Sequence, residues 1–132
     1  MATSAQARCG RATEREPSIV LDLANRTATK VLGSEMADPS AAKFVEIDVV
    51  DVSNPKRIRL AFDLFASEEK EERRLLGTFA LFPPDHPGNF IVSTQGRLRT
   101  GSALVLSMRV LDDVTPDDTV RVEVRRMLLR KE

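Results

Sequence analysis

Histidine and aspartate are the residues of this sequence with which an enzyme could move protons or activate a nucleophile. The single histidine, His86, stands directly after Asp85 in a proline-rich segment. Nucleophilic catalysis needs a nucleophile and a positioned base, and histidine is the usual base. Because the side chains of sequence neighbours diverge, we expect His86 and Asp85 not to form a working pair. The sequence therefore predicts an ordinary surface-loop histidine at this position.

Two carboxylate pairs, Asp112–Asp113 and Asp117–Asp118, offer a second kind of chemistry. Hydrolysis by two carboxylates, or binding of calcium through their oxygens, is formally open to them. Both pairs fall in predicted turns, where aspartate accepts hydrogen bonds from backbone amides and remains solvated. A solvated carboxyl has no reason to show the raised pKa of a general acid, and the spacing matches no EF-hand. We therefore interpret all four as turn residues.

Composition limits the remaining chemistry. The 132 residues correspond to one ordinary domain, and 42% hydrophobic with 30% charged residues is typical of a globular protein. One cysteine, Cys9, excludes an internal disulfide, and one histidine excludes a zinc or copper site built mainly of imidazoles. The six glycines are scattered, so no phosphate-binding glycine loop is present. We predict no catalytic residue, no metal site and no cofactor in this chain.

Charge and aromatic content argue against several classes of partner. Twenty basic residues are matched by twenty acidic ones, so no net field attracts nucleic acid or an anionic membrane. No apolar run reaches the roughly 18 residues of a membrane-spanning helix, and no secretory signal is recognisable. Tryptophan and tyrosine are absent, which leaves no aromatic platform for sugars or bases. We expect a soluble protein without nucleic-acid or membrane partners, and the sequence leaves its compartment open.

Apolar and polar residues alternate with a period of two along most of the chain, as in half-buried strands. Val45, Ile47 and Val49, for example, are separated by Glu46 and Asp48. The segment 75–82 is apolar on both faces, which predicts a central strand. The expected strands cover residues 18–23, 43–52, 57–65, 75–82, 90–92, 103–110 and 119–125.

Turn residues separate these segments, and the whole pattern predicts a fold class. Short strands about ten residues apart, joined by proline-, glycine- and aspartate-rich turns, favour an all-β fold. We predict one antiparallel β-sandwich of about seven strands over residues 18–130, preceded by a flexible tail or linker over 1–17. Phe62, Phe79 and Phe90 are expected in its core.

Two segments fit this pattern less well. Residues 67–74 (SEEKEERR) are almost all charged, and we interpret them as a solvated loop between strands. The alternative is a helical turn with Glu–Arg pairs four residues apart. Residues 109–114 could likewise close as a short turn of helix after the preceding strand.

Several short motifs, in a consistent order, resemble the C-terminal KFDV-type domain of plant polyphenol oxidases and related bacterial tyrosinases. The most informative are AFDLF at 61–65 and LGTF at 76–79, which correspond to that domain's KFDV and AGSF segments. Residues 19–22 resemble its LVLD segment, residues 83–86 its loop before the next strand, and residues 111–124 its ending. The motif residues that we expect to be structural are Phe62, Asp63, Leu64, Gly77 and Phe79.

The resemblance implies a regulatory rather than a catalytic role. In that family the domain binds no copper, packs over the entrance of a separate di-copper catalytic domain and keeps the enzyme latent. This chain lacks the family's copper-binding histidine motifs, so copper would belong to a partner catalytic domain, bound in cis or in trans. Residues 1–17 would then be the linker from that catalytic domain.

The loop that follows the LGTF segment is the candidate shielding element. It extends from Phe82 to Asn89, it is stiffened by prolines, and so it would lose little entropy on docking. The residues that we expect to lie over the copper site are Phe82, Pro83, Pro84, Asp85 and His86. The alternative function is a stand-alone β-sandwich that serves as a protein-interaction or oligomerisation module, with a resemblance that reflects the fold alone.

Overall fold

The computed structural model describes residues 18–32, 41–68, 71–96, 98–99 and 101–131. These residues form an all-β structure, which confirms the predicted class, but they contain eight strands rather than about seven. The predicted tail or linker over 1–17 lies outside the described residues. The strands are β1 (Ile19–Asp22), β2 (Thr27–Val31), β3 (Phe44–Ser53), β4 (Leu60–Glu68), β5 (Glu71–Ala80), β6 (Gly88–Ser93), β7 (Ala103–Val110) and β8 (Arg121–Arg130).

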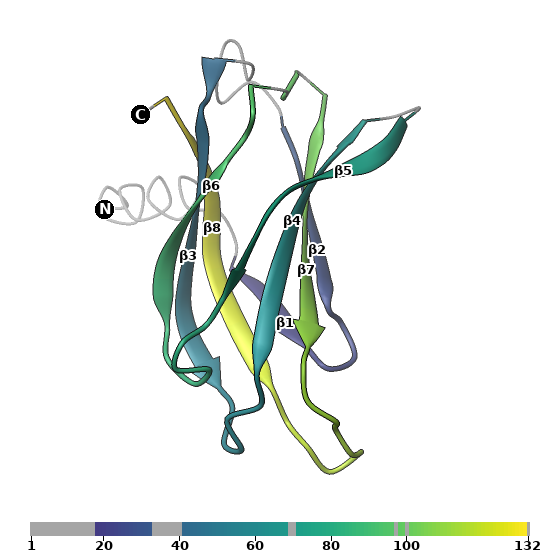
Figure 1. Ribbon diagram of the computed structural model, residues 1–132, viewed down its shortest axis with the longest axis vertical. Coiled ribbons are helices and arrows are strands. Elements are labelled where there is room, and N and C mark those ends of the chain that lie inside the picture. The colour runs from purple at the N-terminus through teal and green to yellow at the C-terminus, as the bar shows by residue number, and fades with distance from the viewer. Residues whose placement is uncertain (1–17, 33–40, 69–70, 97, 100, 132) are drawn as a thin grey trace, which may run out of the picture.

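The strands form two antiparallel four-stranded sheets, in the orders β1-β8-β3-β6 and β2-β7-β4-β5 (Figure 1). Each strand of the first half pairs with its counterpart in the second half: β1 with β8, β2 with β7, β3 with β6, and β4 with β5. The chain is therefore one long hairpin of nested pairs, rolled so that alternate pairs fall in opposite sheets. This is the eight-stranded jelly-roll topology.

One hydrophobic core fills the space between the two sheets. Val45 and Ile47 of β3 are fully buried on one side, and Phe62 and Leu64 of β4 are fully buried on the other, as the alternation predicts. The ring of Phe79 stacks on Phe62 at 5.1 Å and on Phe90 at 4.3 Å between ring centroids. Because Phe90 belongs to β6, this stack joins the two sheets. Phe62 is fully buried, whereas Phe79 and Phe90 are partly buried against the core.

The strand that the sequence analysis missed is β2. Its sequence, TATKV, has no large apolar residue that faces the core, so it gives no strong alternation signal. It forms a strand at the edge of its sheet, mainly through backbone pairing with β7. The expected central position of residues 75–82 is also wrong. They belong largely to β5, which is the other edge strand of the same sheet and ends at Ala80.

The charged run 67–74 is not simply a solvated loop. β4 extends through Glu68 and β5 begins at Glu71, so most of the run forms the ends of a hairpin, and residues 69–70 lie outside the described part. The Arg73 guanidinium lies 4.7 Å from the centroid of the Phe65 ring. This cation–π contact gives the charged run a packing interaction that its own sequence, without apolar residues, does not provide. Residues 109–114 form no helical turn, since β7 continues to Val110 and irregular structure follows.

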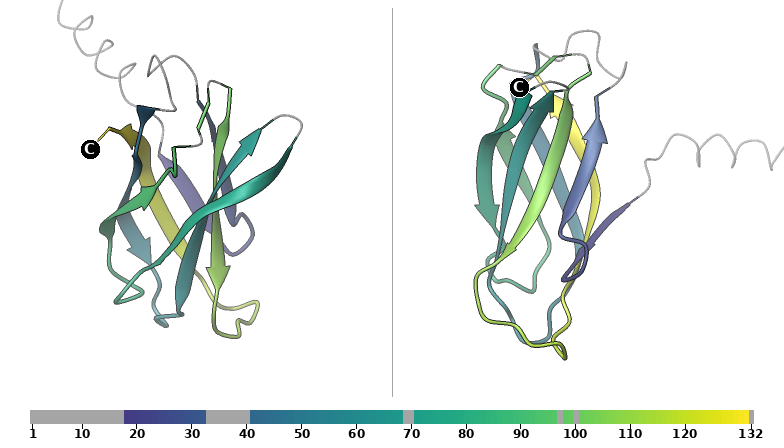
Figure 2. Two further views of the ribbon diagram at one scale, coloured as in Figure 1. Left: turned by 45° about the horizontal axis from the view of Figure 1, so that its top comes forward. Right: turned by 90° about the vertical axis from the view of Figure 1, so that its right-hand side faces the viewer.

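Four loops gather at one end of the molecule, at the bottom of Figure 1 and in both views of Figure 2. They connect β1 to β2, β3 to β4, β5 to β6 and β7 to β8, and cover residues 23–26, 54–59, 81–87 and 111–120. Among the described residues, no helix is long and apolar enough to cross a membrane.

Candidate functional site

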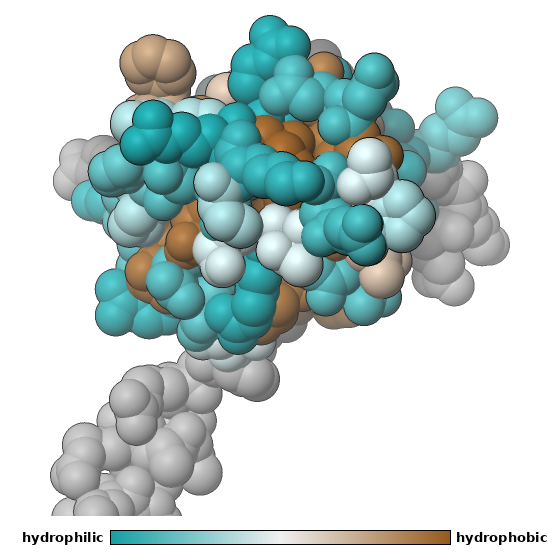
Figure 3. All heavy atoms as spheres, turned by 90° about the horizontal axis from the view of Figure 1, so that it is seen from below, coloured by the Kyte–Doolittle hydropathy of each residue, from teal (hydrophilic) through white to brown (hydrophobic). Residues whose placement is uncertain are grey.

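The candidate shielding loop, predicted over residues 82–89, covers residues 81–87, because β6 already begins at Gly88. It lies at this end of the molecule and carries the most exposed large apolar side chain described. Phe82 is 94% exposed, whereas Leu81 before it is buried in the core. Phe82 is joined to Pro83 by a cis peptide bond. Hydrophilic residues cover most of the surrounding end face, with only smaller hydrophobic areas between them (Figure 3). An isolated large apolar side chain in such a setting is the part of the surface most suited to burial against another protein.

The neighbouring loop 54–59 holds this loop in place. The Asn54 side chain donates from Nδ2 to the Pro84 carbonyl at 3.1 Å. The Arg57 Nε donates to Asp85 Oδ2 at 3.2 Å, and the His86 backbone N–H donates to the Pro83 carbonyl at 3.1 Å. Residues 83–86 are thus fixed at three points.

His86 and Asp85 are in contact, contrary to the expectation that their side chains diverge. His86 Nδ1 lies 2.9 Å from Asp85 Oδ1, because the turn that bonds the His86 amide to Pro83 brings both side chains to one side. The bond to His86, aided by Arg57, lowers the pKa of Asp85. The described residues place no hydroxyl or thiol on the imidazole, which is mostly exposed as predicted. The pair therefore lacks the nucleophile that acyl transfer would need.

Asp112 and Asp118 serve as loop anchors. Asp112 accepts hydrogen bonds from the Arg59 guanidinium and from the Arg59 backbone N–H, and these lower its pKa. Asp118 pairs with Lys56 and accepts from the Thr115 backbone N–H, with the same effect on its pKa. A general acid needs a raised pKa, so these environments oppose that role.

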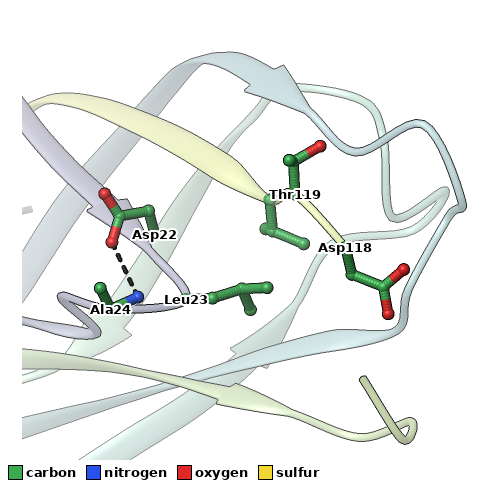
Figure 4. A pocket seen from close by; sticks show the side chains of 6 residues that line it. Asp22, Leu23, Ala24, Asp118 and Thr119 are labelled. Carbon is green, nitrogen blue, oxygen red and sulfur yellow. Dashed lines mark hydrogen bonds between the residues drawn. The ribbon is translucent and has the colours of Figure 1, made fainter. Parts of the chain in front are cut away.

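A shallow hollow of about 320 Å³ lies between the 23–26 loop and the segment before β8. Asp22 at its rim turns its carboxylate back to the loop, where Oδ1 accepts from Ala24 N at 2.9 Å and from Asn25 N at 2.7 Å (Figure 4). No group of histidine, cysteine, aspartate or glutamate in the described ranges is arranged to hold a metal ion. The lining residues are Asp22, Leu23, Ala24, Asp118, Thr119 and Val120.

The residues of the AFDLF and LGTF segments lie opposite one another on β4 and β5. Asp63 accepts from Thr78 Oγ1 and from Arg109 Nε, each at 2.7 Å, so that Asp63 joins three strands. Partial burial raises the pKa of Asp63, but the bonds from Arg109 and Thr78 outweigh it and leave the pKa lowered. Phe62 and Leu64 point into the core on either side of Asp63. The motif therefore forms the framework from which the 81–87 loop emerges.

Sequence reasoning missed the role of Asn54, because asparagine before proline reads simply as a turn. The structure buries its side chain between two loops. It also missed the row of apolar residues Val105, Phe65 and Leu75 on the outer face of the β2-β7-β4-β5 sheet, because the strands in question were assigned without their neighbours.

Comparison with protein-family models, with curated proteins and with solved structures finds no match for this chain. The resemblance to the KFDV-type domain therefore rests on the motifs themselves.

Proposed function

We propose that this chain is a non-catalytic domain that covers the active-site entrance of a tyrosinase-like di-copper catalytic domain and keeps that enzyme latent. The loop residues Phe82 to His86 would be the covering element. The observation that carries the proposal is the almost complete exposure of Phe82 on a loop that the neighbouring loop 54–59 holds through Pro84 and Asp85.

The energetics of this loop favour docking. Burying an exposed phenylalanine side chain contributes about 1.5–3 kcal/mol, which is available only when a partner covers it. Two prolines and three hydrogen bonds already order residues 83–86, so binding costs little further conformational entropy. Phe82 would fill the apolar mouth of a copper site, and Asp85 and His86 would lie at its rim.

The KFDV-like residues support the choice of partner. Phe62 and Asp63 lie on β4 and Gly77 lies on the neighbouring strand β5, which leads directly into the loop. In the family that they resemble, the domain packs over the entrance of a separate di-copper catalytic domain.

The test is a titration of this chain against a copper-loaded tyrosinase catalytic domain that has no covering domain, with diphenol oxidation as the readout. We expect saturable inhibition by the unaltered chain. Phe82→Ala should weaken the inhibition about 10- to 100-fold, because it removes the apolar contact. Ile91→Ala is the matched control, because Ile91 is an exposed apolar residue on the outer face of the β1-β8-β3-β6 sheet, away from the loop. This variant should inhibit like the unaltered chain.

A tethered version makes a negative result decisive. If the free chain does not inhibit, residues 1–17 are used to join it to the catalytic domain, which raises its effective concentration to about the millimolar range. Full activity of the tethered enzyme would overturn the proposal. Equal inhibition by the Phe82→Ala and unaltered chains would overturn the role of this loop.

A second function, self-association, is favoured by the outer face of the β2-β7-β4-β5 sheet. Val105, Phe65 and Leu75 lie side by side across three strands of this face, and Val31 lies in the next row on β2. Val31 and Leu75 are 67% and 52% exposed. The outer face of the opposite sheet carries ion pairs such as Arg125–Asp48 and Arg130–Glu46, together with the exposed apolar residues Ile91 and Leu128.

The occupant that fits this face is a second copy of the chain. Asp63 and Arg109, which pair with each other on the face, would meet the same pair in reverse order across a two-fold axis. The chain's net charge of zero adds no repulsion between copies. Sedimentation equilibrium should show a dimer that Leu75→Glu dissociates and Ile91→Glu does not. A monomer at every concentration would remove this second function.

A further inference from the structure

The loop 54–59 contacts both of the long loops at its end of the molecule. Its three basic side chains each pair with an aspartate from a neighbouring loop: Lys56 with Asp118, Arg57 with Asp85, and Arg59 with Asp112. All three basic side chains are largely exposed, and exposed ion pairs contribute little to holding a loop. The fixed position of the 81–87 loop therefore needs another cause.

Asn54 provides a buried connection between the two loops. Its side chain is only 4% exposed, and its Oδ1 accepts from the Ile58 backbone N–H at 3.0 Å. Its Nδ2 donates to the Ile58 carbonyl at 2.8 Å and to the Pro84 carbonyl at 3.1 Å. One amide thus closes its own loop and reaches across to the loop that carries Phe82. In a buried site such bonds are strong, and their loss leaves polar groups unpaired.

The chemistry of the 81–87 loop makes it depend on this contact. Pro83 and Pro84 have no backbone N–H, so the loop has few donors with which to fix itself. The exposed Phe82 ring makes almost no contacts that could set its direction. Its orientation follows from the backbone, and the Pro84 carbonyl, two residues away, is the backbone group that Asn54 binds.

We propose that Asn54 is the positioning residue of the docking loop: it fixes the direction of Phe82 through the Pro84 carbonyl without touching the partner. As a statement about docking, this inference rests on the proposed function. As a statement about loop order, it can be tested on the chain alone.

The chain contains no tryptophan or tyrosine, so Phe82→Trp introduces a single fluorophore at the tip of the loop. Time-resolved fluorescence anisotropy of this variant measures the local motion of the tip without any partner. Asn54→Asp keeps the Oδ1 acceptor for Ile58 but removes both donors. Asn54→Ser keeps a short-range bond to Ile58 but is too short to reach Pro84. Asn54→Ser is used for the measurement if the buried carboxylate of Asn54→Asp prevents folding.

Thr94→Val is the matched control. Thr94 is buried at the opposite end of the molecule, where its Oγ1 donates to the Ala42 carbonyl at 2.7 Å. This variant should lower the free energy of unfolding and leave the motion of the tip unchanged. In the Asn54 variants we expect the fast-motion amplitude of the introduced tryptophan to at least double while far-UV circular dichroism stays native.

The docking arm uses the inhibition assay with Phe82 intact. Loss of the Asn54 bond should weaken inhibition about tenfold, as expected for one buried hydrogen bond, while Thr94→Val inhibits like the unaltered chain. Unchanged tip motion in a folded Asn54 variant would overturn the inference. Increased tip motion in a chain that never inhibits would instead uphold the role of Asn54 and overturn the proposed function.

Discussion

Gly77 illustrates how a single residue sets the distance between the two sheets. A Cβ atom at this position would lie 2.7 Å from Cγ1 of Val92, closer than carbon atoms approach in a packed core. Gly77 is on β5 and Val92 is on β6, so these edge strands of opposite sheets approach each other through the missing side chain. The glycine of the LGTF motif therefore has a packing role.

Replacing Gly77 with alanine should destabilise the fold by about 1–3 kcal/mol, because the added methyl group overpacks the contact with Val92. Urea denaturation of Gly77→Ala would measure this loss. The double variant Gly77→Ala/Val92→Ala provides the space again, and should be more stable than the two separate losses would predict. Additive losses would contradict the packing explanation.

Among the elements, the loop 54–59 organises its end of the molecule. It contacts the β5–β6 and β7–β8 loops, each of which crosses from one sheet to the other, and binds both through charged side chains. Asn54 adds a buried connection to the β5–β6 loop. The φ angle of Arg57 is 51°, in the left-handed region that non-glycine residues rarely occupy. Such conformations persist where surrounding contacts fix the chain, which fits a loop held on both sides.

These loop contacts should weaken in acid. Hydrogen bonds and charge lower the pKa values of Asp85, Asp112 and Asp118 below that of an ordinary carboxyl. Groups with a lowered folded-state pKa stabilise the structure above the unfolded-state value near 4. That contribution is lost as the pH falls through the lower folded-state values. Protection of the amide hydrogens in the 111–120 loop, measured against the exchange rate of the unfolded chain at the same pH, should therefore decrease between about pH 5 and pH 2.

A substitution assigns this effect to a particular carboxyl. Asp112→Asn should remove part of the acid dependence of unfolding, because the amide cannot be protonated in this range and binds Arg59 less strongly. Asp113→Asn is the matched control, since this neighbouring side chain is exposed and forms no ion pair among the described residues. An identical acid dependence in both variants would argue against the loop pairs as its source.

At the scale of the whole molecule, nested pairing makes the two sheets interdependent. Each strand pair except the outermost, β1 with β8, is enclosed by a pair of the other sheet, so neither sheet is a continuous piece of chain. The stack of Phe62, Phe79 and Phe90 adds a direct link between the sheets. We expect one cooperative unit, whose distant strand pairs make folding slow, on the millisecond to second scale.

Phe62→Ala should destabilise the fold by about 3–5 kcal/mol, because it leaves a cavity at the fully buried end of this stack. Unfolding should remain a single transition, with the same midpoint by far-UV circular dichroism and by the fluorescence of a tryptophan introduced as Phe82→Trp. Phe65→Ala is the control: Phe65 lies on the outer face under Arg73, and its loss should cost less. Two separate transitions would contradict the single core.

The alternation of the sequence determined which side chains face the core. Val45, Ile47, Phe62 and Leu64 were all assigned inward correctly, because the period of two is a local property of an extended chain. The turn residues likewise located most of the connections between strands. The sequence also identified a surface loop over residues 82–89, of which the structure assigns the last two residues to β6.

Only the tertiary structure decided which strands are neighbours. β2 carries no strong apolar signal and exists because β7 pairs with its backbone, and β5 lies at an edge although its residues read as a central strand. Asn54 gains its role because Pro84, thirty residues away, is brought beside it. Hydrogen-bond partners across a sheet or between loops are set by long-range pairing, on which the local period of a sequence carries no information.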